Sequence, residues 1–432
     1  MRIAIIGGGI SGCLSARLLS TRHDVTLFES SDYPGGHAQT VSLDVDGRRL
    51  NVDTAFMVYN QRTYPNFCRL LNMLGVASQP TDMSFSVRCS RRGLEYQGSS
   101  LNGLFAQRAN LFRPSFHRML TDILQFNARA RSDLRNDAVP DDQSAGDYLD
   151  QCRLGRGFRD LYLAPMAAAI WSCDPASVER FPARFLIGFL ANHGLLQIRD
   201  RPQWRTIAGG SQQYVRALLE PIVDSIRLRC RVVGVRRFAE EAVVRTIDGH
   251  CESFDRVVFA THADQTLNIL DDATREEASI LSAFPYRANE AVLHTDARLL
   301  PRRRRAWASW NYHVSPSADQ RASVTYDLSR LQNHPTATPL LLTLNETSAI
   351  DPAKVLRTFT YSHPAYGLDS ARAQGRFLEI SGRRRSHYCG AYWGYGFHED
   401  GVNSALAVAQ QFALTLDACT VASTKEPLLT GV

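Results

Sequence analysis

The chain has 432 residues, of which 44% are hydrophobic and 21% are charged, and this composition excludes a disordered, collagen-like or coiled-coil protein. Its 49 basic residues include only two lysines, Lys354 and Lys425, and they exceed the 43 acidic residues for a formal net charge of +6. The length favours two domains, because a single core of this size would be unusually large.

The nine cysteines are scattered and contain no C-x-x-C pair. This pattern indicates neither a disulfide framework nor a zinc ribbon, so we expect no metal site and a reducing, cytoplasmic environment. No apolar run approaches the roughly 18 residues that cross a bilayer.

The first residues form a nucleotide-binding pattern. Residues 2–6 are a continuous apolar run, which is typical of a strand buried on both faces of a parallel sheet. Gly7, Gly9 and Gly12 complete G-x-G-x-x-G at the start of an apolar helix. These glycines permit a tight turn, a close approach of backbone to a pyrophosphate at the helix N-terminus, and close packing of helix on strand. The predicted cofactor contacts of this turn are Gly7, Gly9, Ile10, Ser11 and Gly12.

A second apolar strand, residues 25–28, ends in Glu29, whose carboxylate can accept both hydroxyls of an adenosine ribose. A second glycine turn follows at Gly35 and Gly36. A nicotinamide dinucleotide domain does not require this second turn, so the pattern favours FAD over NAD and argues against a nicotinamide dehydrogenase. The cofactor residues of this segment are Glu29 and Ser30 and, as the family resemblance described next implies, Gly35, Gly36 and His37.

This arrangement resembles the flavin-containing amine oxidase superfamily, which includes carotenoid-type desaturases and protoporphyrinogen oxidase. In that superfamily the double glycine lines the FAD pyrophosphate and a basic residue usually follows it, a place that His37 holds here. The overall pattern is most similar to the subgroup described as predicted NAD/FAD-binding proteins with an amine oxidase domain. That subgroup is often associated with fatty-acyl-modifying methyltransferases such as cyclopropane synthases. The resemblance implies an α/β protein, in which an FAD-binding Rossmann-like domain of the glutathione reductase type carries an inserted α+β substrate domain.

Further segments match the same superfamily in the expected order. Residues 52–56 resemble the strand that passes the flavin ring, 204–211 the later double-glycine segment, and 256–261 the strand and turn that close over the dinucleotide. Residues 388–392 and 400–405 are similar to the terminal flavin motif. The residues that the resemblance assigns to FAD in these later segments are Thr54, Ala55, Phe56, Val232, Ala260, Thr261, Gly390, Ala391, Gly401, Val402 and Ser404.

The terminal motif also has a physical interpretation. Residues 401–416 are apolar-periodic and follow Asp400, which predicts a helix that begins near Gly401 with Asp400 as its cap. Its N-terminal amides and dipole would stabilise negative charge on reduced flavin. A plain packing helix is the alternative that the pattern leaves open.

The blocks of cofactor motifs predict a discontinuous FAD domain of residues 1–80, 204–284 and 357–432. The intervening residues, 81–203 and 285–356, would form the substrate domain. The first insertion has helical periodicity and the second has strand patterns.

Two arginine-rich stretches raise the question of a lipid or nucleic-acid surface. Between residues 101 and 119, Phe105, Phe112 and Phe116 interleave with arginines. This fits a membrane-surface helix that admits lipid, although an ordinary amphipathic helix with solvated arginines is the favoured interpretation. The run 302–305 is more typical of a solvated loop. Nucleic-acid binding is not expected, because no recognised motif accompanies the run; peripheral contact with the inner face of the membrane and the oligomeric state stay open.

Bound FAD would supply the redox chemistry, so no nucleophile is required. By the same resemblance, His398 falls two residues before Asp400, where amine oxidases place an aromatic side chain beside the flavin. His398 or Tyr392 could therefore contact substrate or relay a proton, or both could merely line the loop. Further pocket candidates, without assigned roles, are Asn311, Tyr312, Tyr361 and His363.

True amine oxidases usually place a lysine beside the flavin, and Lys354 does not match that position well. Cys389 also lacks the family's context for covalent flavin, so noncovalent FAD is expected. We therefore expect an enzyme that removes hydride from a hydrophobic substrate, as a desaturase of an acyl chain or related lipid. An amine oxidase that produces hydrogen peroxide and a flavin-dependent double-bond isomerase without net redox change are the alternatives.

Overall fold

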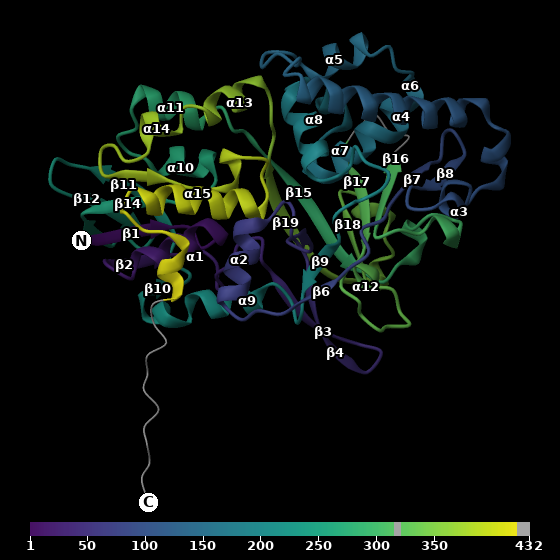
Figure 1. Cartoon of the computed structure of the whole chain (residues 1–432). Coiled ribbons are helices and arrows are strands. Elements are labelled where there is room, and N and C mark those ends of the chain that lie inside the picture. The colour runs from purple at the N-terminus through teal and green to yellow at the C-terminus, as the bar shows by residue number, and fades with distance from the viewer. Residues whose placement is uncertain (315–320, 421–432) are drawn as a thin grey trace, which may run out of the picture.

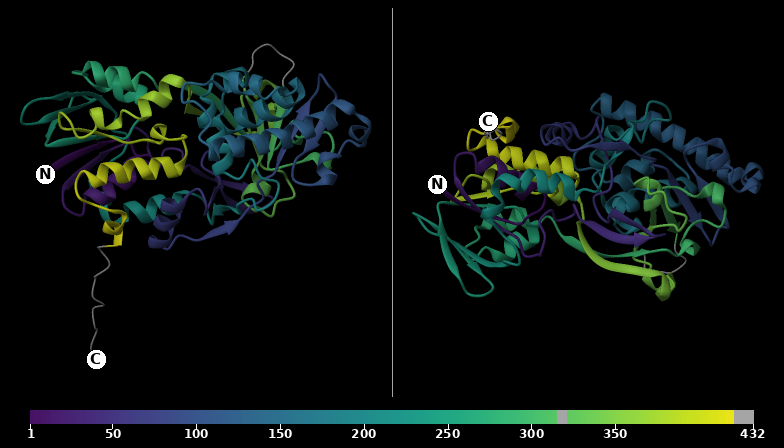
Figure 2. Two further views of the ribbon diagram at one scale, coloured as in Figure 1. Left: turned by 45° about the horizontal axis from the view of Figure 1, so that its top comes forward. Right: turned by 90° about the horizontal axis from the view of Figure 1, so that it is seen from below.

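The computed structural model describes residues 1–314 and 321–420 and consists of two lobes (Figure 1). One lobe is built on a five-stranded parallel sheet and the other on a seven-stranded mixed sheet. We call them the parallel-sheet lobe and the mixed-sheet lobe. Two further orientations show the lobes side by side (Figure 2).

The parallel sheet collects strands from the beginning, the middle and the end of the chain. β1 lies at its centre, between β2 and β14. Ile3 and Ile5 of β1 pack into the core on one face, whereas Ala4 packs into the core on the other. This burial on both faces explains the apolar run of the strand. In spatial order the strands are β10 (Ile226–Arg227), β2 (Asp24–Phe28), β1 (Arg2–Ile6), β14 (Arg256–Phe259) and β20 (Ser386–Tyr388).

Two different layers cover the parallel sheet. The core on one face is completed by α1 (Ile10–Leu19), α2 (Pro65–Met73), α9 (Gln212–Leu219) and α15 (His398–Gln410). The core on the other face is completed by an antiparallel sheet of β11 (Val232–Arg237), β12 (Ala242–Thr246) and β13 (Cys251–Phe254), together with α10 (Ala263–Ile269), α11 (Arg275–Leu281), α13 (Leu368–Gln374) and α14 (Phe377–Ile380).

The mixed sheet forms the second lobe, and its strands are antiparallel except where β16 pairs with β7. In spatial order they are β19 (Val355–Pro364), β15 (Tyr286–His294), β18 (Leu341–Leu344), β17 (Ser323–Asp327), β16 (Trp310–Val314), β7 (Phe85–Cys89) and β8 (Leu94–Gln97). One large apolar core joins this sheet to the helices around it. These helices are α4 (Pro114–Arg135), α5 (Ala145–Gln151), α6 (Arg156–Phe158), α7 (Ala164–Trp171) and α8 (Ala183–Asn192), and two further helices are α3 (Leu101–Leu104) and α12 (Leu328–Leu331).

Strands β15 and β19 connect the lobes. Their antiparallel ladder runs from the pair Tyr286–Pro364 to the pair His294–Val355, and Tyr286 itself packs against the core of the parallel-sheet lobe. The predicted domain boundary at residue 357 falls inside β19, which belongs to the mixed sheet.

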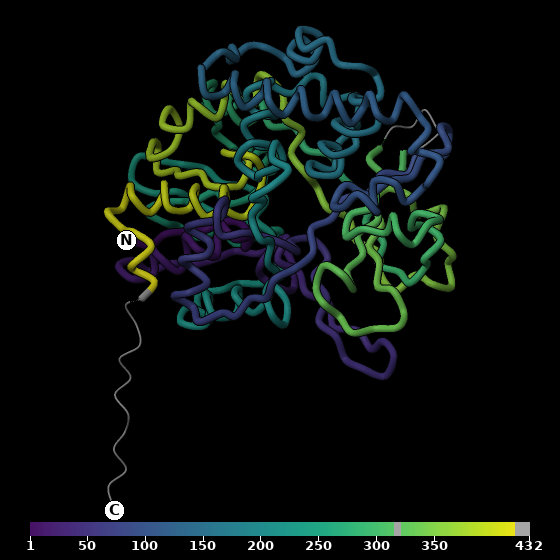
Figure 3. The backbone as a smooth tube through the Cα atoms, turned by 45° about the vertical axis from the view of Figure 1, so that its right-hand side comes forward, coloured from purple at the N-terminus to yellow at the C-terminus, as the bar shows by residue number. Residues whose placement is uncertain are grey.

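Two small sheets complete the fold. The hairpin of β3 (Thr40–Val45) and β4 (Arg48–Asp53) extends from the body of the molecule, as the tube shows (Figure 3). Strand β9 (Trp204–Ile207) pairs on one side with β5 (Tyr59–Asn60) and on the other with β6 (Ser78–Pro80).

Two helical predictions need correction. Helix α15 begins at His398 rather than near Gly401, because the Asp400 carboxylate accepts a hydrogen bond at 2.9 Å from the backbone amide of Phe397 and so lies in the first turn. The stretch 101–119 is not one helix with interleaved faces: Phe116 is buried in the core, while Phe112 is 86% exposed. Within the two described ranges no helix is long and apolar enough to cross a membrane.

Candidate cofactor and substrate site

The first glycine turn lies where β1 meets the N-terminus of α1. A Cβ on Gly12 would lie 1.8 Å from the carbonyl oxygen of Gly7, so only glycine lets the helix pack this closely on the strand. Gly7 has φ +103°, and a Cβ there would lie 2.8 Å from the carbonyl oxygen of Ala260, which follows β14. The turn is thus held between the ends of two neighbouring strands.

The second glycine turn packs directly on the first. The amide of Gly35 donates to the carbonyl oxygen of Gly8 at 2.6 Å, and a Cβ on Gly36 would lie 3.1 Å from the Cα of Gly9. The two turns that sequence analysis assigned separately therefore form one backbone surface at the N-terminus of α1.

Glu29 closes this surface at the end of β2. One carboxylate oxygen accepts a hydrogen bond from the amide of Gly8 at 2.7 Å, and the other accepts from the amide of Ser31 at 2.7 Å and from the hydroxyl of Ser30 at 3.2 Å. These contacts fix the carboxylate, which is 8% exposed. Glu29 and Ser30 therefore lie beside the glycine turns, as their assignment to the cofactor requires.

Two observations fit a dinucleotide at this surface. A Cβ built on Gly9 meets no atom within 4 Å, so the backbone there faces open space. The Nε2 atom of His37 is buried without a hydrogen-bond partner among the described residues. Buried polar atoms are normally paired, and the N-terminus of a helix favours a phosphate. A bound pyrophosphate would occupy the open space at Gly9 and give the Nε2 atom of His37 a hydrogen-bond partner.

The terminal motif meets the same helix through hydroxyl groups. The hydroxyl of Ser11 donates to the carbonyl oxygen of Gly401 at 3.0 Å, and the hydroxyl of Ser404 accepts from the amide of Gly390 at 2.9 Å. A Cβ on Gly401 would lie 2.7 Å from the Cγ2 of Ile10. The structure thus brings α1, α15 and the end of β20 together, although about 390 residues separate Ser11 from Gly401.

The segment after β4 forms the seam between the lobes. The hydroxyls of Thr54 and Tyr361 lie 2.7 Å apart, and the Tyr361 hydroxyl donates to the Oε1 of Gln39 at 2.5 Å. The amide of Phe56 donates to the carbonyl oxygen of His37 at 2.9 Å. Residues assigned to the flavin ring therefore lie against β19 of the mixed sheet.

Three histidines gather at this seam from distant parts of the chain. The ring centroid of His37 lies 5.4 Å from that of His363 and 6.4 Å from that of His262. Burial, together with repulsion from a neighbouring histidine, lowers the pKa of His37 and of His262 to about 4 and that of His363 to about 3. The cluster is therefore uncharged near neutral pH, and it has no metal-binding arrangement among the described residues.

His398 lies in the same region, inside the parallel-sheet lobe. Its ring stacks on Phe56 with centroids 3.4 Å apart, and its Nε2 lies 3.0 Å from the hydroxyl of Tyr214. Burial holds the pKa of His398 well below its ordinary value, and His37 lowers it further. The neutral His398 ring is thus positioned by its packing on Phe56 and its contact with Tyr214. A role for His398 in catalysis stays a prediction.

Tyr392 lies in a different apolar core. Its ring packs 5.0 Å from Phe284 and 5.1 Å from Trp393, and its hydroxyl is buried without a partner among the described residues. Burial raises the pKa of Tyr392 well above its ordinary value. The structure thus does not bring Tyr392 and His398 into one core.

The remaining predicted residues fall into two groups. Asn311 is structural, because its amide bonds only to Ser86 and to the backbone around β16 and β17, and Tyr312 is part of the mixed-sheet core. The others lie near strand ends or helix starts: Ala55 after β4, where it packs against the mixed-sheet core, Val232 at the start of β11, Thr261 after β14, Ala391 at the start of the 3-10 turn η9 (Ala391–Trp393), and Val402 in α15.

Sequence analysis named Tyr361 and His363 as pocket candidates but did not place them beside His37 and His262. Tyr361 and His363 are two residues apart on β19, so they share one face of the strand. That spacing was visible in the sequence. Their contact with His37 was not, since it depends on how β15 and β19 cross between the lobes.

An aromatic layer positions the mixed-sheet lobe over the start of α15. The indole NH of Trp171 in α7 donates to the carbonyl oxygen of Tyr395 at 3.1 Å. In α8, Phe189 stacks on Phe397 with centroids 5.1 Å apart, and Phe185 lies 4.9 Å from Tyr395. The loop that leads into α15 is therefore packed between both lobes.

Two other side chains bear on the type of chemistry, Lys354 and Cys389. Lys354 precedes β19, and its Nζ lies 3.6 Å from the buried carboxylate of Asp296. Nine residues of extended strand, at about 3.3 Å each, put the backbone of Lys354 roughly 30 Å from that of His363. Cys389 is fully buried beside Ser15, and burial raises the pKa of its thiol to about 12.

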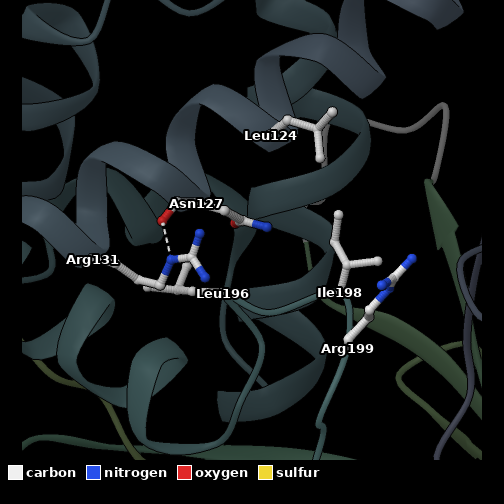
Figure 4. Close-up of a pocket in the computed structure, with 6 residues that line it drawn as sticks. All are labelled: Leu124, Asn127, Arg131, Leu196, Ile198 and Arg199. Atoms are coloured by element: carbon white, nitrogen blue, oxygen red, sulfur yellow. Dashed lines mark hydrogen bonds between the residues drawn. The ribbon is translucent and has the colours of Figure 1, made fainter.

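A surface pocket of about 390 Å³ lies in the mixed-sheet lobe, between α4 and the segment after α8 (Figure 4). It contains none of the residues assigned to the cofactor. Its lining residues are Leu124, Asn127, Arg131, Leu196, Ile198 and Arg199.

Comparisons with known proteins agree with this architecture. The sequence profile of the family described as "Flavin containing amine oxidoreductase" matches residues 10–412. A triple variant of putrescine oxidase is similar in structure, with a TM-score of 0.68, 16% identity, and coverage of 95% of this chain and 98% of that one. A putative protoporphyrinogen oxidase from Exiguobacterium sp. 255-15 is similar at a TM-score of 0.67, with 16% identity and the same coverage.

A fatty acid isomerase from P. acnes that produces CLA also shares the fold, with a TM-score of 0.63, 15% identity, and coverage of 95% of this chain and 98% of that one. A search of curated protein sequences found no match. At these identities the solved structures show a common fold.

Proposed function

The chain belongs to the flavin-containing amine oxidoreductase family and is an FAD-dependent oxidoreductase, and we propose that its substrate is hydrophobic, an acyl chain or related lipid from which it removes hydride. FAD accepts the hydride when it is bound. The residues that would hold it are the two glycine turns, Glu29 and the unpartnered ring of His37.

The position of Lys354 is the observation that carries the substrate proposal. The resemblance to true amine oxidases implies a lysine close to the flavin, but Lys354 lies at the far end of β19 and is paired with Asp296. Lys425 lies outside the described residues. Among the described residues, therefore, no lysine lies at the seam in the place that a true amine oxidase would use.

The electrostatics of the seam point the same way. His37, His262 and His363 have lowered pKa values and are neutral near pH 7. An ammonium substrate buried among neutral rings would lose its hydration without gaining a counter-charge. An uncharged hydrocarbon chain loses no such hydration, so it suits this environment better.

We further propose that FAD is bound noncovalently. Cys389 precedes the terminal motif, but its thiol is fully buried and its raised pKa keeps it protonated. A cytoplasmic location belongs to the same proposal, since all nine cysteines are free thiols, as a reducing compartment requires.

A first experiment tests the cofactor. The purified full chain should show visible flavin absorbance, and acid precipitation should release the flavin into the supernatant, where mass spectrometry identifies FAD. Flavin that stays with the precipitated polypeptide would contradict noncovalent binding. Absence of flavin even after FAD is supplied would contradict the assignment of the glycine turns.

A second experiment tests the substrate class. Lipid extracts from a strain lacking the gene should contain acyl chains two hydrogens richer than those of the complemented strain, and the purified enzyme should convert them in the presence of an electron acceptor. A product of unchanged mass formed without an acceptor would establish the isomerase alternative, which one structural neighbour makes relevant. Hydrogen peroxide and ammonia released from amines would establish the amine oxidase alternative.

A further inference from the structure

Two arginine-rich segments that are distant in sequence meet at one end of the mixed-sheet lobe. Helix α3 and strand β8 both pack against the 3-10 turn η6 (Arg304–Ala306). Glu95 of β8 accepts hydrogen bonds from the amides of Arg302 and Arg303, and its carboxylate pairs with the guanidinium of Arg303 at 3.2 Å. The run 302–305 is therefore attached to the lobe rather than being a free loop.

The turn that follows α3 belongs to the same surface. Arg108, in the 3-10 turn η1 (Arg108–Phe112), donates to the Oδ1 of Asn102 at 2.8 Å and to the carbonyl oxygen of Phe105 at 3.1 Å. These bonds fix η1 against α3. The backbone of this end of the lobe is thus built from α3, η1 and η6.

The charged side chains of these segments are positive. Residues 96–121 and 297–314 contain no Asp or Glu, and Glu95, which borders the first of these stretches, is buried and paired with Arg303. Arg108, Arg302 and Arg305 are exposed. Such a surface attracts anionic groups within about one Debye length, roughly 10 Å at 0.1 M salt.

Exposed apolar side chains lie on α3 and η1, the segments that contribute Arg108 to this surface. Leu101 is 76% exposed, Leu111 is 45% exposed and Phe112 is 86% exposed. The neighbouring Phe105 and Phe116 pack on each other with centroids 5.9 Å apart, so the stretch already contributes to the core without Phe112. We call the combination of Leu101, Arg108, Leu111, Phe112, Arg302, Arg304 and Arg305 the Arg–Phe face.

We propose that the Arg–Phe face docks on the surface of an anionic lipid bilayer. Phe112 and the two leucines enter the boundary between headgroups and acyl chains, and the arginines contact lipid phosphates. An acidic protein would need the arginines alone, whereas the exposed Phe112, in the same turn as Arg108, favours a bilayer. This proposal concerns where the protein binds and stands independently of the substrate it oxidises.

The location of the face is compatible with docking. It lies at the end of the mixed-sheet lobe that is remote from the parallel sheet (Figures 1 and 2). A bilayer at this end would leave the glycine turns and α1 away from the lipid.

Vesicle co-sedimentation of the full chain tests the proposal. We expect binding to vesicles of equal parts phosphatidylcholine and phosphatidylglycerol, weak binding to phosphatidylcholine alone, and loss of binding at about 1 M salt, where the Debye length is about 3 Å. Phe112→Ser should lower the partition coefficient about tenfold, and Arg302→Ser with Arg305→Ser should lower it roughly 30-fold.

Matched controls are available outside the Arg–Phe face. The control for Phe112→Ser is Leu378→Ser, because Leu378 is 71% exposed on α14. The control for the arginine pair is the double variant Arg48→Ser with Arg49→Ser, because both of these arginines are exposed. Both controls should bind as the parent does, and circular dichroism should show that all variants fold. Equal binding to both vesicle types, or no binding, would overturn the proposal. Full binding by Phe112→Ser would also overturn it, because pure charge attraction would fit an acidic protein equally well.

Discussion

The hydroxyl of Tyr361 lies 2.7 Å from the hydroxyl of Thr54, and this contact joins β19 of the mixed sheet to the segment that follows β4 in the parallel-sheet lobe. Because Tyr361 also donates to Gln39 at 2.5 Å, three polar side chains from both lobes satisfy one another at the seam. The relative position of the lobes is therefore specified by hydrogen bonds as well as by apolar packing.

We expect Tyr361→Phe to lower the free energy of unfolding by about 1–3 kcal/mol, since it leaves the buried Thr54 hydroxyl with only its 3.5 Å contacts to Gln39. Urea denaturation measures the change. Tyr366→Phe is the matched control, because the Tyr366 hydroxyl is buried without a partner among the described residues, and its removal should be neutral or stabilising. Equal effects of the two substitutions would contradict the role of the seam.

Gly9 and Gly12 should respond differently to alanine. Gly9→Ala places a methyl group in open space, so the stability of the apoprotein should change by less than about 0.5 kcal/mol, while the affinity for FAD falls. Gly12→Ala places its methyl group against the Gly7 carbonyl and should destabilise the protein with or without FAD. Denaturation of the apoprotein and titration with FAD separate the two effects. Unchanged FAD affinity in Gly9→Ala would show that the pyrophosphate does not approach this turn.

Gly401→Ala should separate α15 from α1. Its Cβ would lie 2.7 Å from Ile10 and 3.1 Å from the hydroxyl of Ser11, and overpacking of this kind costs about 1–3 kcal/mol. We expect lower thermal stability and weaker FAD binding. Gly157→Ala is the control, because its Cβ would meet only Met119, at 3.9 Å, and alanine is the better helix former. A control as unstable as the test variant would exclude the steric explanation.

Acidification should weaken the fold through the seam histidines. The pKa of His363 falls from 6.5 to about 3 on folding, so the unfolded chain binds more protons between these values, and stability decreases as pH falls from about 6.5. His363 contributes to the free energy of unfolding at pH 7, and at most about 2 kcal/mol of this contribution is lost by pH 5. His363→Gln should therefore show a smaller difference in unfolding free energy between pH 7 and pH 5 than the parent protein. An identical difference would mean that the pKa of His363 is not lowered on folding.

Much of the parallel-sheet lobe could be predicted, because its signals are local. The G-x-G-x-x-G turn requires only a strand, a turn and a helix start within about a dozen residues, and all three lie where the sequence places them. The family and the α/β fold are confirmed. The terminal helix was also recognisable, although its start at His398 was not, since an acidic residue can cap a helix from outside or from its first turn.

The sequence by itself determined the family, the cofactor class and the residues of the two glycine turns, because backbone requirements near a phosphate restrict residue types at fixed spacing. Only the tertiary structure decided which side chains share the seam. His37, His262 and His363 meet because β15 and β19 cross between the lobes, and Lys354 lies far away because it stands at the opposite end of β19. Such contacts depend on long-range strand register, which no local pattern of residues encodes.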